Sequence, residues 1–268
     1  MKIAFIGGGA MGSALINGII AGKAAEAKDI ILFEKDEERA AKLSEAAGIS
    51  TAKSEKEAVL AADIIFICVK PQITGIVAKE IAGVADGKII ISIAAGVTVR
   101  SYTQFLGDNA KIVRCIPNLP AQVGEGITGV FFYNINDDLI KTEIKGLFEA
   151  VGSVVEVKSE KMIDEMIAVT SSSPAYFCIM IEAMADYAVK VGFTRKDALI
   201  MAEKAMEGTS AYLLEKGKHP GVLKDEVCSP GGTTIAAVEA LEINRFRGTV
   251  MDAMEACRKK AVKTEGYV

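Results

Sequence analysis

The sequence predicts an N-terminal α/β domain with a doubly wound sheet, followed by an all-α domain, and two observations support this. Through the first 158 residues, short apolar runs alternate with segments of helical spacing, which is the pattern of a doubly wound sheet. After residue 158 no strand-like run appears, and long segments with helical spacing follow one another. We therefore expect two domains, 1–158 and 159–268.

Each strand is expected where β-branched and other apolar residues run together. The runs 64–69 and 88–93 are almost continuously apolar, as in parallel strands that are buried on both faces of a sheet. The expected strands are 2–6, 29–34, 64–69, 88–93, 111–116, 127–132 and 154–157. The helices expected between them are 13–20, 36–47, 55–62, 73–81, 98–106 and 137–151.

The second domain is expected to contain helices at 161–170, 174–191, 195–215, 233–242 and 245–263. Eight of the ten methionines fall in this half, where their flexible side chains would fill a helical core. About 110 residues of long apolar helices make a thin domain. We therefore expect part of its surface to be buried against a second copy of the chain. A helical core without a partner is the alternative.

The composition argues against several classes of protein. A net charge of −4 and the lack of a basic cluster argue against nucleic acid as a partner. The chain enters a strand at its second residue and shows no continuous apolar run of membrane-spanning length, so we expect a cytoplasmic protein without a signal peptide or membrane segment. Five scattered cysteines and the single histidine, His219, argue against a metal site or a disulfide framework.

The first strand ends in Gly7-Gly8-Gly9-Ala10-Met11-Gly12, and a helix follows at once. In this context of strand, turn and helix, G-x-G-x-x-G indicates a dinucleotide-binding site of the Rossmann type. Gly7 would permit the turn, Gly9 would let the backbone approach a pyrophosphate, and Gly12 would let the helix pack closely on the strand. The free N–H groups at the helix start would face the phosphates. The alternative is a glycine turn without a ligand.

Two residues at the end of the second strand bear on the choice of cofactor. Glu34 lies 22 residues after Gly12, where an acidic side chain accepts from both ribose hydroxyls of NADH. Its carboxylate would repel the 2′-phosphate of NADPH, whereas Lys35 would attract it. Neighbouring residues of a strand point in opposite directions, so only one is expected to face the ribose. The position favours Glu34 and therefore NADH, with NADPH used less well; the alternative for Glu34 is a solvated charge.

Four loops follow the carboxyl ends of predicted strands, where doubly wound sheets bind their ligands. These loops are Gly7–Gly12, Lys70-Pro71, Ala94–Gly96 and Pro117–Pro120. We expect them to converge on one crevice.

Two further segments suggest a site for a small anion. Ser229-Pro230-Gly231-Gly232-Thr233-Thr234 is irregular and enters a helix, and paired glycines before a helix expose N–H groups that can bind a carboxylate. Ser171 to Tyr176 places serines at a helix N-cap and Pro174 at the first helical position. Ordinary helix caps are the alternative for both. Beside a nicotinamide crevice, these segments suggest a small carboxylate substrate that accepts or gives hydride.

Taken together, these residues resemble the pyrroline-5-carboxylate reductase family over essentially the whole chain. The most specific stretch is Ser229–Thr234 followed by Leu241-Glu242. The other matching motifs are Ile6–Gly12, Val69-Lys70-Pro71, Ala94-Ala95-Gly96, Arg114 with Pro117-Asn118 and Pro120, Ser172 with Pro174-Ala175-Tyr176, and His219-Pro220-Gly221 with Leu223-Lys224-Asp225.

The resemblance implies reduction of the cyclic imine 1-pyrroline-5-carboxylate to L-proline, the last step of proline biosynthesis, with NADH or NADPH. It also implies homodimers through interlocked C-terminal helices, often assembled as pentamers of dimers, with an active site between the nucleotide domain of one subunit and the helical domain of another. It implies that the Ser229–Thr234 loop holds the substrate carboxylate and that the Thr234 hydroxyl meets the ring nitrogen.

The site residues expected from motif and resemblance are catalytic, substrate-binding or cofactor-binding, and no metal is expected. Thr234 is the expected catalytic residue. The expected substrate-binding residues are Ser172, Ser229, Gly231, Gly232, Thr233 and Thr234. The expected cofactor-binding residues are Ile6, Gly7, Gly8, Gly9, Ala10, Met11, Gly12, Glu34, Lys35, Cys68, Val69, Lys70, Pro71, Ala94, Ala95, Gly96 and Asn118.

The chain departs from the family pattern at a few positions. Ser171 and Ser173 stand where the family usually has glycines, and their Cβ atoms narrow the options of the backbone. Glu226 stands where an amide-bearing residue is common near the cofactor.

Two other functions are alternatives to this one. A β-hydroxyacid dehydrogenase shares the glycine-rich opening but needs a lysine on an inter-domain helix, for which only Lys190 is available. The other is a non-catalytic NAD(H)-sensing protein.

Overall fold

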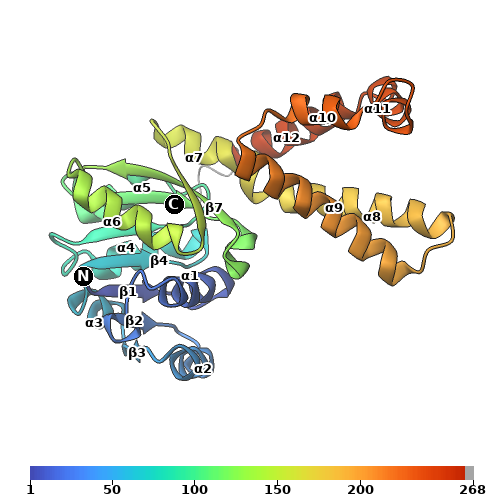
Figure 1. Ribbon diagram of the computed structural model, residues 1–268. Helices are drawn as coiled ribbons and strands as arrows, with labels where there is room; N and C mark the ends of the chain where they lie inside the picture. Colours follow the sequence, from blue (N-terminus) through green and yellow to red (C-terminus); the bar gives the residue numbers. More distant parts are fainter. Residues whose placement is uncertain (263–268) are drawn as a thin grey trace. The chain divides into compact units, whose positions relative to one another are not determined.

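The structure of the protein is a computed structural model that describes residues 1–262 (Figure 1). The chain forms two compact units. The first comprises Met1–Ser171 and the segment that begins at Cys257, and the second is Ser172–Ala256. The division falls later in the chain than the expected boundary after residue 158, which stays a prediction.

An eight-stranded sheet forms the centre of the first unit, and this confirms the predicted doubly wound α/β fold. Its strands lie in the order β3-β2-β1-β4-β5-β6-β7-β8, and every neighbouring pair is parallel except β6 and β7. The strands are β1 (Ile3–Ile6), β2 (Ile30–Phe33), β3 (Ser50–Thr51), β4 (Ile64–Ile67), β5 (Ile89–Ser92), β6 (Lys111–Ile116), β7 (Gly126–Tyr133) and β8 (Gly152–Glu156). The sequence pattern missed β3 because it has only two residues, both exposed.

Helices cover both faces of this sheet, and alternate residues of each strand supply the two cores. In β1, Ile3 and Phe5 face one core and Ala4 and Ile6 face the other, as the period of two along a strand requires. The helices on the first face are α1 (Ala10–Ala21), α2 (Glu37–Ala47) and α6 (Asp138–Glu149). Those on the second face are α3 (Glu55–Leu60), α4 (Pro71–Ile81) and α5 (Val99–Leu106). Two short 3₁₀ turns, η1 (Ala27–Asp29) and η2 (Leu119–Val123), complete the connections.

A buried ion network holds α7 (Glu160–Met166) against the sheet. Arg114 on β6 is 1% exposed, and its guanidinium donates to both carboxylate oxygens of Asp164, at 2.9 and 3.2 Å. It also donates to Glu160 at 2.9 Å, and the same Glu160 oxygen accepts from the N–H of Val99, the first residue of α5, at 2.6 Å. Burial alone would lower the pKa of Arg114, but the two carboxylates raise it by more, so the guanidinium stays charged.

The second unit is made of helices, as predicted. After a π-helical turn at Ile167–Ser171, the helices are α8 (Ser173–Lys190), α9 (Arg195–Lys216), α10 (Pro220–Val227), α11 (Thr233–Ile243) and α12 (Phe246–Val262), the last of which returns to the first unit. The helix α10 was not predicted. Residue 263, the last of the expected final helix, lies outside the described residues.

Small residues make up the interior of the second unit. Its buried hydrophobic residues, among those described, are Ala185, Ala198 and Ala202, which lie on the paired helices α8 and α9 (Figure 1). Large apolar side chains remain outside, including Ile179, which is 67% exposed, and Leu214, which is 84% exposed. Such a surface indicates that these helices have a partner.

One helical stretch bears on the expectation that the chain has no membrane segment. The consecutive helical segments from Glu160 to Lys190 are long and apolar enough to cross a membrane by length and composition alone, and 17% of their most apolar window is buried. The sequence showed no continuous apolar run there because Glu182 and a polar stretch around Ser171 interrupt it. Only the helical continuity of the fold reveals the length.

The ion network leads to a prediction about stability. Replacement of Asp164 by alanine leaves the buried Arg114 with only the partly exposed Glu160, so we expect the free energy of unfolding to fall by about 3 kcal/mol. Denaturant unfolding at one fixed protein concentration measures this. Lys42→Ala, which removes an exposed pair with Glu38, is the control and should cost less than about 0.5 kcal/mol. Equal losses in the two variants would contradict the prediction.

Candidate active site

The glycine turn after β1 has the geometry that its sequence predicted. Gly7 has a φ of +101°, which side chains rarely tolerate, and its N–H donates to the Phe33 carbonyl at 2.8 Å. A Cβ atom on Gly7 would lie 2.7 Å from the Cys68 carbonyl oxygen. A Cβ on Gly12 would lie 2.4 Å from the Gly7 carbonyl oxygen, so α1 packs directly on the turn. Both positions therefore require glycine for steric reasons.

Gly9 differs from these two glycines. Among the described residues, apart from Gly9 and its two chain neighbours, no heavy atom lies within 4 Å of the point where its Cβ would be. Gly9 is also the N-cap of α1, and no side chain caps this helix start. The backbone at Gly9 is thus accessible, and the first N–H groups of α1 are not capped by a side chain. This is the arrangement that binds phosphate at a helix N-terminus.

Glu34, the residue after β2, lies against this turn. One carboxylate oxygen accepts from the Gly8 N–H at 2.8 Å, and the other accepts from the Asp36 N–H at 3.0 Å. The side chain is only 10% exposed, and Arg39 lies 3.4 Å from it. These contacts disfavour the alternative that Glu34 is a freely solvated charge. They also hold Glu34 beside the glycine turn, where a ribose-binding residue is expected. Lys35 is exposed, and the described part of the chain shows no hydrogen bond or ion pair from its side chain.

The other predicted loops follow neighbouring strands of the sheet. Because β1, β4, β5 and β6 are consecutive and parallel, the loops after them begin at the same edge. Cys68 and Val69, directly after β4, contact the glycine turn, since both have atoms within 3.2 Å of the position of a Gly7 Cβ. Lys70 precedes α4 and is its N-cap, and Pro71 begins that helix. Burial raises the pKa of the Cys68 thiol, which therefore stays protonated.

The hydroxyl groups of Ser92 and Tyr102 hold the start of the loop Ala94–Gly96. The Ser92 hydroxyl accepts from the Ala94 N–H at 3.3 Å and bonds the Tyr102 hydroxyl at 2.6 Å. Burial raises the pKa of Tyr102 to about 12, so this side chain is neutral and serves as a structural support. Gly96 has a φ of +72°, which the turn requires. Ser92 and Tyr102 belong to no motif, so the sequence did not indicate this role.

Asn118 is buried and has a structural role that the sequence did not predict. Its amide oxygen accepts from the Ile127 N–H at 2.9 Å, and its amide nitrogen donates to the Thr170 carbonyl at 3.0 Å. It thereby joins the start of β7 to the π-helical turn. Its expected contact with the cofactor stays a prediction.

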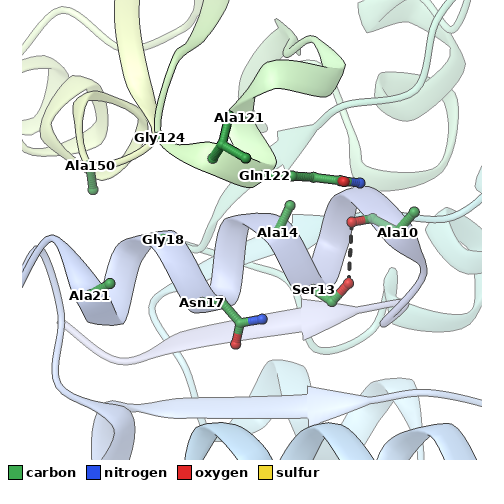
Figure 2. A pocket seen from close by; sticks show the side chains of 11 residues that line it. Ala10, Ser13, Ala14, Asn17, Gly18, Ala21, Ala121, Gln122, Gly124 and Ala150 are labelled. Carbon is green, nitrogen blue, oxygen red and sulfur yellow. Dashed lines mark hydrogen bonds between the residues drawn. The ribbon is translucent and has the colours of Figure 1, made fainter. Parts of the chain in front are cut away.

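A groove of about 560 Å³ lies between α1 and η2, as Figure 2 shows. It is lined by Ala10, Ser13, Ala14, Asn17, Gly18, Ala21, Ala121, Gln122, Val123, Gly124 and Ala150. Of these residues only Ala10 belongs to the predicted cofactor set. The groove therefore overlaps the predicted cofactor set at one residue, and its other side follows the predicted Pro117–Pro120 loop.

The loop before α11, in the second unit, contains a left-handed glycine and an internal hydrogen bond, and its expected binding of an anion stays a prediction. Gly231 has a φ of +66°, and the Gly232 N–H donates to the Ser229 carbonyl at 3.0 Å. A Cβ on Gly232 would lie 2.3 Å from the Ser229 hydroxyl oxygen. Gly232 is the N-cap of α11 and no side chain caps the helix, which disfavours an ordinary serine or threonine cap. Thr233 and Thr234 occupy the first turn of that helix.

The other predicted positions of the second unit have local roles. Ser172 precedes α8 and Pro174 lies in its first turn, directly after the π-helical turn, a feature often found at functional sites. His219, the only histidine, caps α10, because its Nδ1 accepts from the Gly221 N–H at 3.1 Å. Glu226 forms an ion pair with Lys218 at 2.7 Å. Among the described residues, no group of three or more histidine, cysteine, aspartate or glutamate side chains is placed to hold a metal.

Two family models of known proteins match the two halves of the chain. Residues 2–96 match the family model for NADP oxidoreductases that are coenzyme F420-dependent, and residues 160–264 match the model for the dimerisation domain of pyrroline-5-carboxylate reductase. The protein is therefore an oxidoreductase with a dinucleotide-binding sheet and a helical dimerisation domain.

Full-length relatives identify the family. The chain is 41% identical to pyrroline-5-carboxylate reductase of Escherichia coli K12 over 98% of its own length and 97% of that protein. A solved pyrroline-5-carboxylate reductase from Coxiella burnetii superposes with a TM-score of 0.93 at 30% identity over 98% of both chains. A Plasmodium falciparum pyrroline carboxylate reductase, solved with NADP bound, gives 0.85 at 29% identity over 99% of this chain and 98% of that one. This chain belongs to the pyrroline-5-carboxylate reductase family, which argues against a β-hydroxyacid dehydrogenase built around Lys190.

The open space at Gly9 leads to a second prediction. Gly9→Ala adds a methyl group that clashes with no described part of the chain, so the unfolding midpoint of the protein without cofactor should stay near that of the wild type. The same methyl group would obstruct a pyrophosphate, and we expect affinity for NADH to fall by about tenfold or more. Calorimetric titration measures the affinity. Gly12→Ala is the contrasting variant, which should destabilise the protein itself. An unchanged affinity in Gly9→Ala would contradict the prediction.

Proposed function

We propose that the protein reduces 1-pyrroline-5-carboxylate to L-proline with NADH as the preferred hydride donor, and that the Ser229–Thr234 loop binds the substrate. The family assignment makes the protein a pyrroline-5-carboxylate reductase of proline biosynthesis. The main support for the proposal is the match to a family member over 98% of this chain. In addition, a glycine turn precedes α11, and no side chain caps the start of that helix.

The cofactor site is assigned to the carboxyl edge of the sheet. The turn Gly7–Gly12 and the start of α1 would bind the pyrophosphate, and Glu34 would accept from the ribose hydroxyls. Cys68 to Pro71, Ala94–Gly96 and Asn118 would line the remainder, as the family resemblance implies. The bound cofactor supplies the hydride, and the chain supplies its orientation and the local electrostatics.

The substrate chemistry is assigned to the loop before α11. The imine carbon accepts a hydride and the ring nitrogen acquires or keeps a proton, so the products are L-proline and the oxidised cofactor. The Gly232 N–H already donates to the Ser229 carbonyl, so the N–H groups of Thr233 and Thr234, at a helix start that no side chain caps, would bind the carboxylate. The Thr234 hydroxyl would orient the ring nitrogen by a hydrogen bond. An unassisted threonine hydroxyl is a poor acid, so we assign Thr234 an orienting role rather than proton donation.

The preference for NADH rests on Glu34. Its carboxylate accepts from the Gly8 N–H and is only 10% exposed, so it is held beside the turn. There it would favour ribose hydroxyls and oppose a 2′-phosphate. The NADP-bound Plasmodium falciparum relative supports NADPH as an alternative donor.

The helical half is assigned to assembly. This half matches the family model of a dimerisation domain and exposes apolar side chains such as Ile179 and Leu214. Both observations agree with a homo-oligomer in which the helices of another subunit, rather than lipid, cover these side chains. We propose a homodimer or a pentamer of dimers, which light scattering distinguishes. We also propose a cytoplasmic protein with functional domains at 1–158 and 159–268, the second of which carries the substrate loop.

The reaction and the cofactor preference are tested together. Absorbance of NADH and of NADPH should fall when purified protein receives pyrroline-5-carboxylate, with a higher kcat/KM for NADH. Oxo and hydroxy acids should give no comparable rate. Glu34→Ser should shift the ratio of efficiencies toward NADPH, because the variant lacks the carboxylate that repels the 2′-phosphate. No turnover of the imine with either cofactor would refute the reaction, and a wild-type preference for NADPH would refute the role of Glu34.

The Thr234 hydroxyl is tested separately. Thr234→Ala should lower kcat/KM by about one to two orders of magnitude, the size of one hydrogen bond that strengthens in the transition state. Cofactor affinity should barely change. Thr234→Ser retains a hydroxyl and should keep most of the efficiency. Full efficiency in Thr234→Ala would exclude an orienting role.

A further inference from the structure

The first turn of α2 places a guanidinium group beside Glu34. One terminal nitrogen of Arg39 lies 3.4 Å from the Glu34 carboxylate, and the other lies 3.3 Å from the Asp36 carboxylate. Asp36 is the N-cap of α2 and also accepts from the Arg39 backbone N–H at 3.0 Å. Both ends of Arg39 are therefore anchored near the ribose-binding position assigned to Glu34.

The contact between Arg39 and Glu34 can open without isolating the carboxylate. Glu34 keeps its hydrogen bonds from the N–H groups of Gly8 and Asp36, which do not involve Arg39. The Arg39 side chain is 52% exposed, whereas that of Glu34 is 10% exposed. The Arg39 side chain is thus accessible to a nucleotide, whereas most of the Glu34 side chain is covered.

A 2′-phosphate is the group that would exchange with Glu34 at this guanidinium. It carries nearly two negative charges, and arginine binds phosphate oxygens with two parallel hydrogen bonds. We propose that Arg39 is the residue through which this enzyme accepts NADPH, while Glu34 selects for the ribose hydroxyls of NADH. The inference rests on the proposed cofactor site and extends it, because it explains how a site with an acidic residue can still admit a phosphate.

Other cations near this position are less suited to the role. Lys35 is adjacent to Glu34 in sequence and, like it, lies after the end of β2, but its exposed side chain makes no ion pair with Glu34 among the described contacts. Lys42, three residues further along α2, pairs with Glu38 at 2.6 Å. Arg39 is the cation that the structure places on Glu34.

The experiment measures nucleotide binding without substrate, so its result does not depend on imine reduction. Calorimetry gives the dissociation constants of four ligands: NADP⁺, NAD⁺ and the fragments 2′,5′-ADP and ADP. The full-length proteins compared are the wild type, Arg39→Ala, Arg39→Lys, Lys35→Ala and Lys42→Ala. Arg39→Ala should weaken NADP⁺ and 2′,5′-ADP roughly tenfold to a hundredfold, as expected for loss of a charge-assisted contact. NAD⁺ and ADP should change by less than about threefold.

The remaining variants sharpen the result. Arg39→Lys keeps the charge but not the paired hydrogen bonds, so its loss for NADP⁺ should be intermediate. Lys42→Ala removes one positive charge from the same helix and should affect both nucleotides equally and weakly. The inference would be overturned if Arg39→Ala lost affinity for both nucleotides equally or for neither. It would also be overturned if Lys35→Ala, and not Arg39→Ala, lost affinity for NADP⁺ selectively, or if the wild type bound no NADP⁺. Failure of imine turnover would count against the proposed function and would leave these affinities measurable.

Discussion

Arg114 must be paired because it is almost completely buried, and its pairing connects three parts of the first unit. The guanidinium on β6 binds Asp164 and Glu160 of α7, and Glu160 also accepts from the N–H of Val99 at the start of α5. An unpaired charge at this depth would cost several kcal/mol, so β6, α7 and α5 are held in one arrangement. The network thereby fixes the start of α5, just after the Ala94–Gly96 loop, which is assigned to the cofactor.

A second constraint acts at the glycine turn, where backbone groups approach too closely for side chains. Gly7 and Gly12 leave no space for a Cβ atom, whereas Gly9 is open. The carboxylate of Glu34 accepts from the Gly8 N–H, so the end of β2 and the turn after β1 are joined. Arg39 adds a positive charge to this junction. The electrostatic character of the ribose position therefore results from an acidic and a basic residue together.

The second unit depends on association in a way that the first does not. The first unit buries large side chains on both faces of its sheet, but the buried hydrophobic residues described in the second unit are alanines. Side chains as large as Ile179 and Leu214 stay exposed. Hydrophobic burial is the main driving force for folding and association, so a dimerisation domain of this kind gains much of its stability from a second copy.

Periodicity and short motifs are local properties of a chain, so the sequence by itself determined the doubly wound sheet, the helical second half and the glycine turn, and its motifs carried the resemblance to the family that the relatives then showed. It did not reveal β3, whose two residues carry no pattern, or α10, which follows the cap formed by His219. Only the tertiary structure showed that Asn118 bridges two backbone segments, that Ser92 and Tyr102 support a loop, and that Arg39 lies on Glu34. These contacts mostly join residues far apart in the chain or on different elements, and sequence spacing alone does not show which side chains meet.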